Sequence, residues 1–444
     1  MRGKKIEDAV APLWGKGASV AFYTLGCKLN FSETSTLARR FVEAGFVRAP
    51  AAQKADIYVV NTCSVTSHAD KKCRQIIRKL TQLNPAALMV VTGCYAQLKP
   101  EEVAAIDGVD LVLGAGQKGD LFEYANNLRT KGKARVLSCD IRAVDSFFPA
   151  FSSGDRTRSF LKIQDGCDYH CAYCTVPLAR GKSRNLPVAD IVKEAETIAA
   201  SGVREITLTG VNIGDFGKTT GETFFELLQA LEKVNAIGRF RISSIEPNLL
   251  TDEMIEWIAQ SKKMAPHFHL PLQSGSNRVL QLMRRRYRRE IFAARLQKIR
   301  TLLPHAFIGV DVIAGFPGET AGDFRDTYAF LERLQPAYLH IFPYSERPGT
   351  PAAAMPGSVP PRERAARVKE LQGLCDKLHR AFYEKNIGLE TRVLWENACK
   401  NGMMQGFTDN YLKIETPYRR ELIGRLVPVK ITDLQIYGFT DLQI

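Results

Sequence analysis

The sequence has no long apolar run. None of its 444 residues lies in a stretch that approaches the roughly 20 apolar residues of a membrane span. The basic start, residues 1–17, is not followed by the apolar segment of a secretory signal. These absences exclude a membrane helix and a signal peptide from our expectation and predict a protein of the reducing cytoplasm. The length favours two or three domains rather than a single core.

Acidic residues are the minority among the charged residues. The chain holds 47 Asp and Glu against 61 Lys and Arg, which gives a formal net charge of +14. An excess of this size suits a polyanionic partner, and nucleic acid is the first candidate. General solubility would also account for a high charge, but a neutral or acidic balance would serve solubility equally well.

A fourth cysteine is missing from the most cysteine-rich segment, CDYHCAYC at residues 167–174. Tetrahedral zinc sites and cubane iron–sulfur clusters both normally take four protein ligands. In a cytoplasmic chain, clustered cysteines are more often metal ligands or catalytic thiols than disulfides. Zinc with His170 as fourth ligand and buried structural cysteines both stay open, although Asp165 and Asp168 indicate a polar loop. The candidate ligands are Cys167, Cys171 and Cys174.

A second set of three cysteines follows three apolar, strand-like stretches in the first part of the chain. The stretches are 19–27, 55–63 and 87–94, and a segment of helical spacing follows each of the first two. This alternation predicts a parallel α/β domain, in which sites form beyond the carboxyl ends of the strands. Those ends carry Cys27, Cys63 and Cys94, so residues far apart in the sequence are expected to meet in one place.

Six further strand-like stretches alternate mostly with helical ones in the second part. This pattern predicts a TIM-like (β/α) barrel, partial if it has only six units, whose polar strand ends form its active face. Short β-type runs after residue 388 predict a small all-β module. We therefore expect an α/β protein with domains at 17–145, 153–383 and 384–444.

The CxxxCxxC spacing is that of the radical S-adenosylmethionine (SAM) superfamily, which the segment 167–174 resembles. The resemblance implies a [4Fe–4S] cluster with three irons held by thiolates and the fourth iron chelated by SAM. An iron left open for the reacting molecule is typical of a catalytic metal site. By resemblance, the SAM contacts are Tyr173, Gly210, Asn212, Glu246, Gln273 and Gly315.

The motifs TLGCKLN, NTCSVT and GCYAQ, placed ahead of such a core, resemble the methylthiotransferase family over nearly the whole chain. The resemblance implies that Cys27, Cys63 and Cys94 bind an auxiliary [4Fe–4S] cluster that carries the sulfur to be inserted. It also implies two SAM molecules per turnover and a close approach of the two cysteine sites. The sulfur donor and the low-potential electron donor have no identifiable signature in the sequence.

The family modifies either tRNA adenosines or a ribosomal protein, and three features favour tRNA. These are the positive charge, a terminal module that resembles a TRAM domain, and the arginine segment 283–290 around Tyr287. Guanidinium groups beside an aromatic ring suit phosphates and stacked bases, although a solvated helix start would also account for them. The candidate RNA contacts are Arg284, Arg285, Arg286, Arg288 and Arg289.

Four motifs resemble the branch that acts on N6-threonylcarbamoyladenosine at tRNA position 37, rather than the isopentenyladenosine branch. They are LGCKLN around Cys27, ARGKSRN (179–185), LMRRRY (282–287) and HIFPYSERPGTPAA (340–353). Departures at Cys73 and Leu178 affect no implied ligand. Alternatives are the isopentenyladenosine reaction, a ribosomal-protein substrate, and a non-enzymatic, metal-stabilised RNA-binding protein. The other cysteines are expected to be packing or surface thiols: Cys73, Cys139, Cys375 and Cys399.

Overall fold

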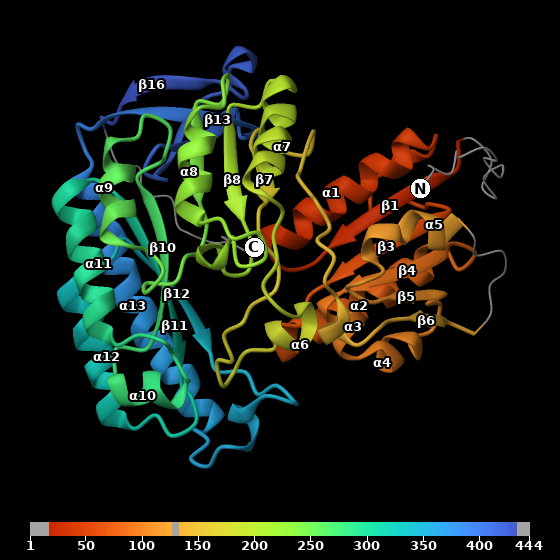
Figure 1. The fold of residues 1–444 in the computed structure, drawn as a ribbon, viewed down its shortest axis with the longest axis horizontal. Coiled ribbons are helices and arrows are strands. Elements are labelled where there is room, and N and C mark those ends of the chain that lie inside the picture. The colour runs from red at the N-terminus through yellow and green to blue at the C-terminus, as the bar shows by residue number, and fades with distance from the viewer. Residues whose placement is uncertain (1–16, 127–132, 433–444) are drawn as a thin grey trace. The chain divides into compact units, whose positions relative to one another are not determined.

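The computed structural model describes residues 17–126 and 133–432 (Figure 1). The chain divides into two compact units, residues 1–148 and 149–444. The repeated TDLQI segment at the end of the sequence lies, except for its first residue Thr432, outside the described residues.

The first unit is built on a fully parallel six-stranded sheet with the order β2-β1-β3-β4-β5-β6. Its central strands β3 and β4 are buried at every residue, as expected for apolar runs covered on both faces. The parallel α/β domain predicted from the sequence is confirmed. The strands are β1 (Ser19–Thr24), β2 (Val47–Ala49), β3 (Ile57–Thr62), β4 (Leu88–Gly93), β5 (Leu111–Leu113) and β6 (Arg135–Leu137).

Helices cover both faces of this sheet (Figure 1). On one face, α1 (Lys28–Glu43) and α5 (Leu121–Asn126) pack on the sheet, and the Phe41 ring meets Phe46 and Phe122 edge-on. The opposite face carries α2 (Ser67–Leu83), α3 (Cys94–Leu98) and α4 (Pro100–Ala104). The strands are thus shielded from solvent on both sides, which leaves their carboxyl ends as the place for a site.

The second unit contains the six predicted barrel strands as two parallel sheets, β7-β8-β9 and β10-β11-β12. Parallel bridges from Phe240 to Met264 and from Ser244 to His269 connect the two sheets. The partial TIM-like barrel is therefore confirmed. Its strands are β7 (Ser159–Lys162), β8 (Glu205–Thr209), β9 (Arg239–Ile242), β10 (His267–Gln273), β11 (Phe307–Ala314) and β12 (Tyr338–Pro343).

Alternate residues of the barrel strands pack against an outer layer of helices. Leu270, Val310 and Leu339, for example, share one apolar core with side chains of these helices. On each strand, the residues directly before and after these therefore point to the inner face of the barrel. The main outer helices are α7 (Val188–Ala200), α8 (Phe224–Glu232), α9 (Asp252–Gln260), α11 (Arg289–Leu302), α12 (Ala321–Leu334) and α13 (Pro361–Lys385). Thr223 and Thr320 begin α8 and α12 with capping boxes.

An antiparallel sheet of order β15-β14-β13-β16 follows α13 and confirms the small all-β module. Its core contains Val393, Trp395 and Met404. The strands are β13 (Glu390–Lys400), β14 (Met403–Thr408), β15 (Lys413–Pro417) and β16 (Leu426–Lys430).

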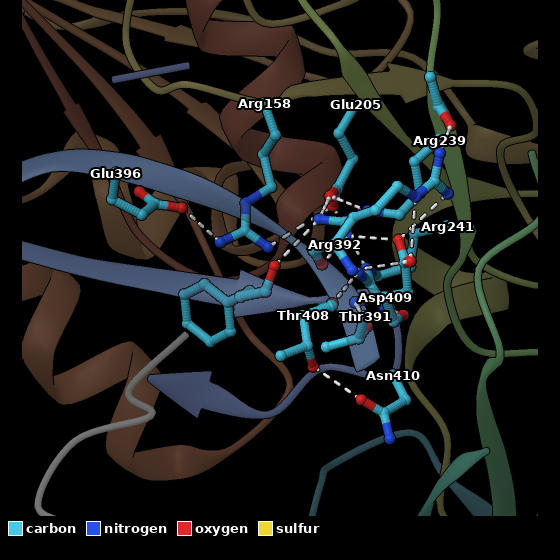
Figure 2. A network of polar contacts seen from close by, with 12 residues as sticks. Arg158, Glu205, Arg239, Arg241, Thr391, Arg392, Glu396, Thr408, Asp409 and Asn410 are labelled. Carbon is cyan, nitrogen blue, oxygen red and sulfur yellow. Dashed lines mark hydrogen bonds and ion pairs between the residues drawn. The ribbon is translucent and has the colours of Figure 1, made fainter. Parts of the chain in front are cut away.

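A buried ionic network joins this module to the amino-terminal ends of the barrel strands (Figure 2). Glu205, at the start of β8, pairs with Arg239 and Arg241 on β9, and Arg158 lies 3.8 Å away. Arg239 also pairs with Asp409 at 2.8 Å, and Arg241 donates to the Asp409 carbonyl at 3.1 Å. The module is thereby held to the barrel by charge as well as by packing.

Candidate active site

The three-cysteine loop lies between β7 and α6 (Val176–Arg180), at the carboxyl end of the first barrel strand. Backbone bonds fix its middle: the Ala172 N–H donates to the Met283 carbonyl at 3.0 Å, and its carbonyl accepts from Ala352 at 2.8 Å. Its start is held by a bond from the Cys167 N–H to the Gly181 carbonyl at 2.9 Å. The loop is therefore held by contacts to segments that follow α6, α10 and β12 in the chain.

Each of the three sulfurs receives a hydrogen bond. The Tyr169 N–H donates to Cys167 Sγ at 3.4 Å, and the Val176 N–H donates to Cys174 Sγ at 3.4 Å. Arg285 Nη1 lies 3.1 Å from Cys171 Sγ. Such donors stabilise a thiolate and are the usual surroundings of a metal-bound cysteine sulfur.

The free thiols are strongly stabilised in their protonated form. Burial raises the pKa of Cys167 to about 11 and, with a further contribution from Cys171, that of Cys174 to about 12. Binding of a cationic centre is what would make these sulfurs thiolates, because a metal ligand must be deprotonated. Three such sulfurs with N–H donors and a guanidinium around them fit a [4Fe–4S] cluster.

Arg285 is part of this site and not of an RNA-binding surface. Its side chain is only 3% exposed and forms an ion pair with Glu246. Tyr287 is also buried, and its hydroxyl bonds to the carbonyls of Pro271 and Leu272. The structure corrects our expectation for these two residues: the burial of Arg285 is compensated by Glu246, and the Tyr287 ring cannot stack on a base.

The remaining arginines of the segment lie nearer the surface. Arg284, Arg286 and Arg288 are exposed, and Arg289 is half-buried with a bond to the Gly275 carbonyl at 3.0 Å. The Arg286 guanidinium stacks 4.1 Å from the centre of the Tyr169 ring. A phosphate contact by these four residues stays a prediction.

Gln164 connects the cysteine loop to the end of β8, where Gly210 and Asn212 were expected to contact SAM. The side-chain oxygen of Gln164 accepts from the Val211 and Asn212 N–H groups, both at 2.9 Å. Its side-chain nitrogen donates to the Gly166 carbonyl at 2.7 Å. The sequence analysis did not select Gln164 as a site residue. The signal that could have identified it is a polar residue at an inner-facing position shortly before the first cysteine of the loop.

Asn212 presents an unsatisfied acceptor at this point. Its side-chain nitrogen donates to Asp215 at 3.0 Å, whereas its side-chain oxygen is buried and has no partner among the described residues. A buried acceptor without a donor is costly unless a ligand supplies one. The amine of SAM is such a donor, so the residue fits the role expected of it.

The other expected SAM contacts lie at the same end of the barrel strands. Tyr173 meets the Phe316 ring edge-on, and Gln273 ends β10 with a φ of 67°. Gly315 has a φ of 76°, and a Cβ there would lie 2.3 Å from Arg364, so packing alone requires a glycine. Glu246 forms an ion pair with Arg285. Their contact with SAM stays a prediction.

The second set of cysteines lies at the carboxyl ends of the adjacent strands β1, β3 and β4. Burial, and then the proximity of Cys94 and Cys27, raises the pKa of Cys63 to about 12. Gly26 has a φ of 100°, and a Cβ there would lie 2.7 Å from the Cys63 Cβ. The three thiols therefore share one place, as the topology predicted.

Two buried polar side chains connect the three loops that carry these cysteines. Asn30 donates to the Leu25 carbonyl at 2.8 Å and to the Thr62 carbonyl at 3.0 Å, which joins the Cys27 and Cys63 loops. The Thr62 hydroxyl donates to the Thr92 carbonyl at 2.6 Å and accepts from Ala96 at 3.3 Å. This second link joins β3 to the Cys94 segment.

Known proteins match both halves of this arrangement. Residues 19–114 match the model of the uncharacterized protein family UPF0004, and residues 161–331 match that of the radical SAM superfamily. The threonylcarbamoyladenosine tRNA methylthiotransferase MtaB of Bacillus subtilis is 41% identical over 93% of this chain and 94% of its own. The chain belongs to the tRNA methylthiotransferase family.

A second relative comes from the other tRNA branch of the family. The tRNA-2-methylthio-N(6)-dimethylallyladenosine synthase of Dictyoglomus thermophilum is 34% identical over 94% of this chain and 96% of its own. Among solved structures, the radical SAM methyltransferase TsrM of Kitasatospora setae superimposes with a TM-score of 0.56 at 16% identity. That match covers 76% of this chain and 77% of TsrM and shows the shared fold.

As a methylthiotransferase the chain is an enzyme of the transferase class, which excludes the non-enzymatic alternative. Its cofactors are two [4Fe–4S] clusters and SAM, as the resemblance implied. No helix within residues 17–126 and 133–432 has the length and apolarity that a membrane crossing requires.

Exchanging Gln164 for glutamate should selectively weaken the radical SAM site of this methylthiotransferase. A carboxylate oxygen would replace the N–H donor that faces the Asp165 and Gly166 carbonyls, so the buried loop would lose its bonds. We expect iron to fall from about eight to about four atoms per chain. The control is Gln281→Glu at an exposed position, and unchanged iron in Gln164→Glu would contradict this role.

The corresponding change in the first unit is Asn30→Asp. It would place a carboxylate against the Leu25 and Thr62 carbonyls and separate the Cys27 and Cys63 loops. We expect the loss of about four irons per chain while SAM binding by the other site persists. Asn401→Asp, in an exposed turn, serves as the control. Full iron retention in Asn30→Asp would show that the link does not position the thiols.

Of the remaining cysteines, Cys73 and Cys375 are packed in the two main cores, as expected for structural thiols. The Cys73 thiol donates to the Cys63 carbonyl at 3.4 Å, and Cys375 interacts with the backbone of Leu339. Cys399 is exposed and Cys139 is half-buried.

Proposed function

We propose that this enzyme converts N6-threonylcarbamoyladenosine at position 37 of tRNA to its 2-methylthio derivative. The observation that carries the proposal is a pair of three-thiol sites at strand ends. In addition, the chain is more similar in sequence to a relative named for this substrate than to a relative named for dimethylallyladenosine. The sequence identities are 41% and 34%, respectively. The motifs around Cys27 and at residues 340–353 support the same branch.

In this proposal Cys167, Cys171 and Cys174 hold the cluster that binds SAM. Cys27, Cys63 and Cys94 hold the auxiliary cluster. When bound, the first cluster would supply the electron for SAM cleavage, and the auxiliary cluster would carry the sulfur to be inserted. The chain's own residues orient these groups: Arg285 and Gln164 fix the first loop, and Asn30 and Thr62 fix the second.

The proposal also assigns roles to the other parts of the chain. Residues 17–145 form the auxiliary-cluster domain, 153–383 the radical SAM domain and 384–444 a TRAM-like, RNA-binding module. The partners are SAM and the anticodon stem-loop of tRNA, with the excess of positive charge, +14, favouring the latter. A sulfur donor and a low-potential electron donor complete the reaction, which we place in the cytoplasm.

The test is the nucleoside content of tRNA from a bacterial strain that lacks its own enzyme of this branch and expresses this chain. We expect 2-methylthio-N6-threonylcarbamoyladenosine by mass spectrometry, and none with Cys171→Ala. Appearance of methylthio-isopentenyladenosine instead would assign the second tRNA branch. Unmodified tRNA together with a methylthiolated ribosomal protein would defeat the assignment to tRNA.

A further inference from the structure

Three titratable side chains meet on the inner face of the barrel, at a place that the cluster chemistry does not use. His269 on β10, Asp311 on β11 and His340 on β12 occupy inner-facing positions of three adjacent strands. Their potential ligand atoms all lie within 4.8 Å of one another. We call these residues the inner trio.

The inner trio is a hydrogen-bonded group. His269 Nε2 lies 2.6 Å from Asp311 Oδ1, and the His269 and His340 rings lie 4.7 Å apart between centres. Two ligand atoms on one zinc ion, with bonds of about 2 Å, normally lie about 3 Å or more apart. His269 and Asp311 are closer than that, so they form a hydrogen-bonded pair rather than a preformed metal site.

Solvent reaches the inner trio. His269 is 20% exposed and Asp311 is 18% exposed in their side chains, whereas the alternate residues of the same strands are buried in the outer core. Gly309 pairs with Tyr338 in the sheet and presents no side chain to the inner face. A Cβ there would lie 3.1 Å from Phe307 and 3.5 Å from His340 Nε2, so a larger residue would crowd the trio.

The trio also lies next to the SAM-binding end of the barrel. Asp311 and Glu246 are close enough to repel each other, and Glu246 pairs with Arg285, which donates to Cys171. Burial alone would raise the pKa of the Asp311 carboxyl. The nearby His269, His340 and Arg285 lower this pKa by more, so the carboxylate is ionised. Arg285 thus links a cluster cysteine to Glu246, and Asp311 of the trio lies within electrostatic reach of Glu246.

From this placement we propose that His269, Asp311 and His340 bind the polar side group of the modified adenosine. The inference rests on the proposed function and names the part of the site that selects the substrate. A threonylcarbamoyl group offers N–H donors to Asp311 and a hydroxyl, a carbonyl and a carboxylate to the imidazoles. On binding, hydrogen bonds to charged and polar side chains of the trio would replace the hydrogen bonds of these polar atoms to water. Charge-assisted hydrogen bonds are strong enough to compensate for the loss of water.

A dimethylallyl group has no atom that can satisfy these side chains. Its binding would cover an ionised carboxylate and two imidazoles with hydrocarbon, and unsatisfied buried polar groups are costly. A site built to bond polar groups rejects an analogue that lacks them more strongly than an apolar pocket rejects a polar one. The inner trio therefore discriminates between the two tRNA branches.

The test measures binding rather than turnover. Anticodon stem-loops carrying threonylcarbamoyladenosine, dimethylallyladenosine or unmodified adenosine are titrated by fluorescence anisotropy against the cluster-loaded protein with SAM. We expect the wild-type protein to prefer the threonylcarbamoyl oligonucleotide, and His340→Phe to reduce that preference about tenfold, as for one lost charged hydrogen bond. His340→Gln should retain most of it, because glutamine keeps a hydrogen-bonding group.

Two controls keep the outcomes separate. His305→Phe changes an exposed histidine of the same unit, and the near-ultraviolet circular dichroism of each variant reports its packing. If His340→Phe misfolds, Asp311→Asn takes its place with the same expectation. A wild-type protein that prefers the threonylcarbamoyl oligonucleotide, with that preference unchanged in the folded variants, overturns the inner-trio proposal alone. A wild-type protein that prefers the dimethylallyl oligonucleotide overturns the proposed function.

Discussion

Replacing Glu205 by glutamine should lower the free energy of unfolding of the barrel and its C-terminal module by about 3–5 kcal/mol. Glu205 is fully buried and is the shared anionic partner of Arg239 and Arg241, with Arg158 3.8 Å away. The amide is isosteric but neutral, so the loss is electrostatic: buried guanidinium groups would keep their desolvation cost without the compensating charge. Urea unfolding monitored by intrinsic fluorescence measures the difference.

The effect has a defined pH dependence. Burial alone would raise the pKa of Glu205, but Arg239, Arg241 and Arg158 together hold it well below its ordinary value. A depressed carboxylate pKa stabilises the fold fully above the unfolded-state pKa of about 4.3, and this contribution is lost as the pH falls through the folded-state pKa. The difference between wild-type and Glu205→Gln should therefore be constant near neutral pH and shrink in acid.

The matched control is Glu256→Gln, which breaks a surface pair with Lys298. The Glu256 side chain is 50% exposed, and such pairs contribute about 0–1 kcal/mol. Similar unfolding midpoints for Glu205→Gln and Glu256→Gln would show that the network does not hold the module to the barrel.

Removing either set of cysteines should remove half of the iron. Triple alanine replacement at Cys167, Cys171 and Cys174 should leave about four irons per chain, held by the first unit, and abolish SAM cleavage. Because each set is held by loops of its own unit, the loss of one should leave the other loaded. Anaerobic iron analysis and electron paramagnetic resonance of the reduced protein measure this.

The reciprocal triple variant at Cys27, Cys63 and Cys94 provides the comparison. It should also retain about four irons, still cleave SAM and form no methylthio product. Complete iron loss in both triple variants would mean that the cysteines form a single shared site. Zinc in place of iron in the wild-type protein would contradict the cluster assignment altogether.

The fold could be predicted because its strands are short apolar runs separated by regular helical stretches. Cys27, Cys63 and Cys94 could be placed together because adjacent parallel strands end at one edge of a sheet, which depends on topology alone. The cysteine loop was predictable from its spacing. These features are local in sequence or follow from general rules of chain connection.

The parts that could not be predicted depend on contacts between distant residues. The arginines of segment 283–290 have identical chemistry in sequence, yet Arg285 is buried against Glu246 while Arg284 and Arg286 are exposed. Glu205 and Asp409 lie far apart in the sequence, and only the docked module shows that they share Arg239. The sequence shows that charged residues occupy positions within the strands, which indicates buried ion pairs. It does not show which residues are their partners.

The most direct test of the central claim uses the purified, cluster-reconstituted protein with SAM, a low-potential reductant and sulfide. It is given equal amounts of two anticodon stem-loops, one with threonylcarbamoyladenosine and one with isopentenyladenosine at position 37, and the nucleosides are analysed by mass spectrometry. We predict a methylthio group on threonylcarbamoyladenosine and an unmodified isopentenyladenosine. Methylthiolation of isopentenyladenosine alone, or of neither nucleoside while SAM is cleaved, would contradict the assignment.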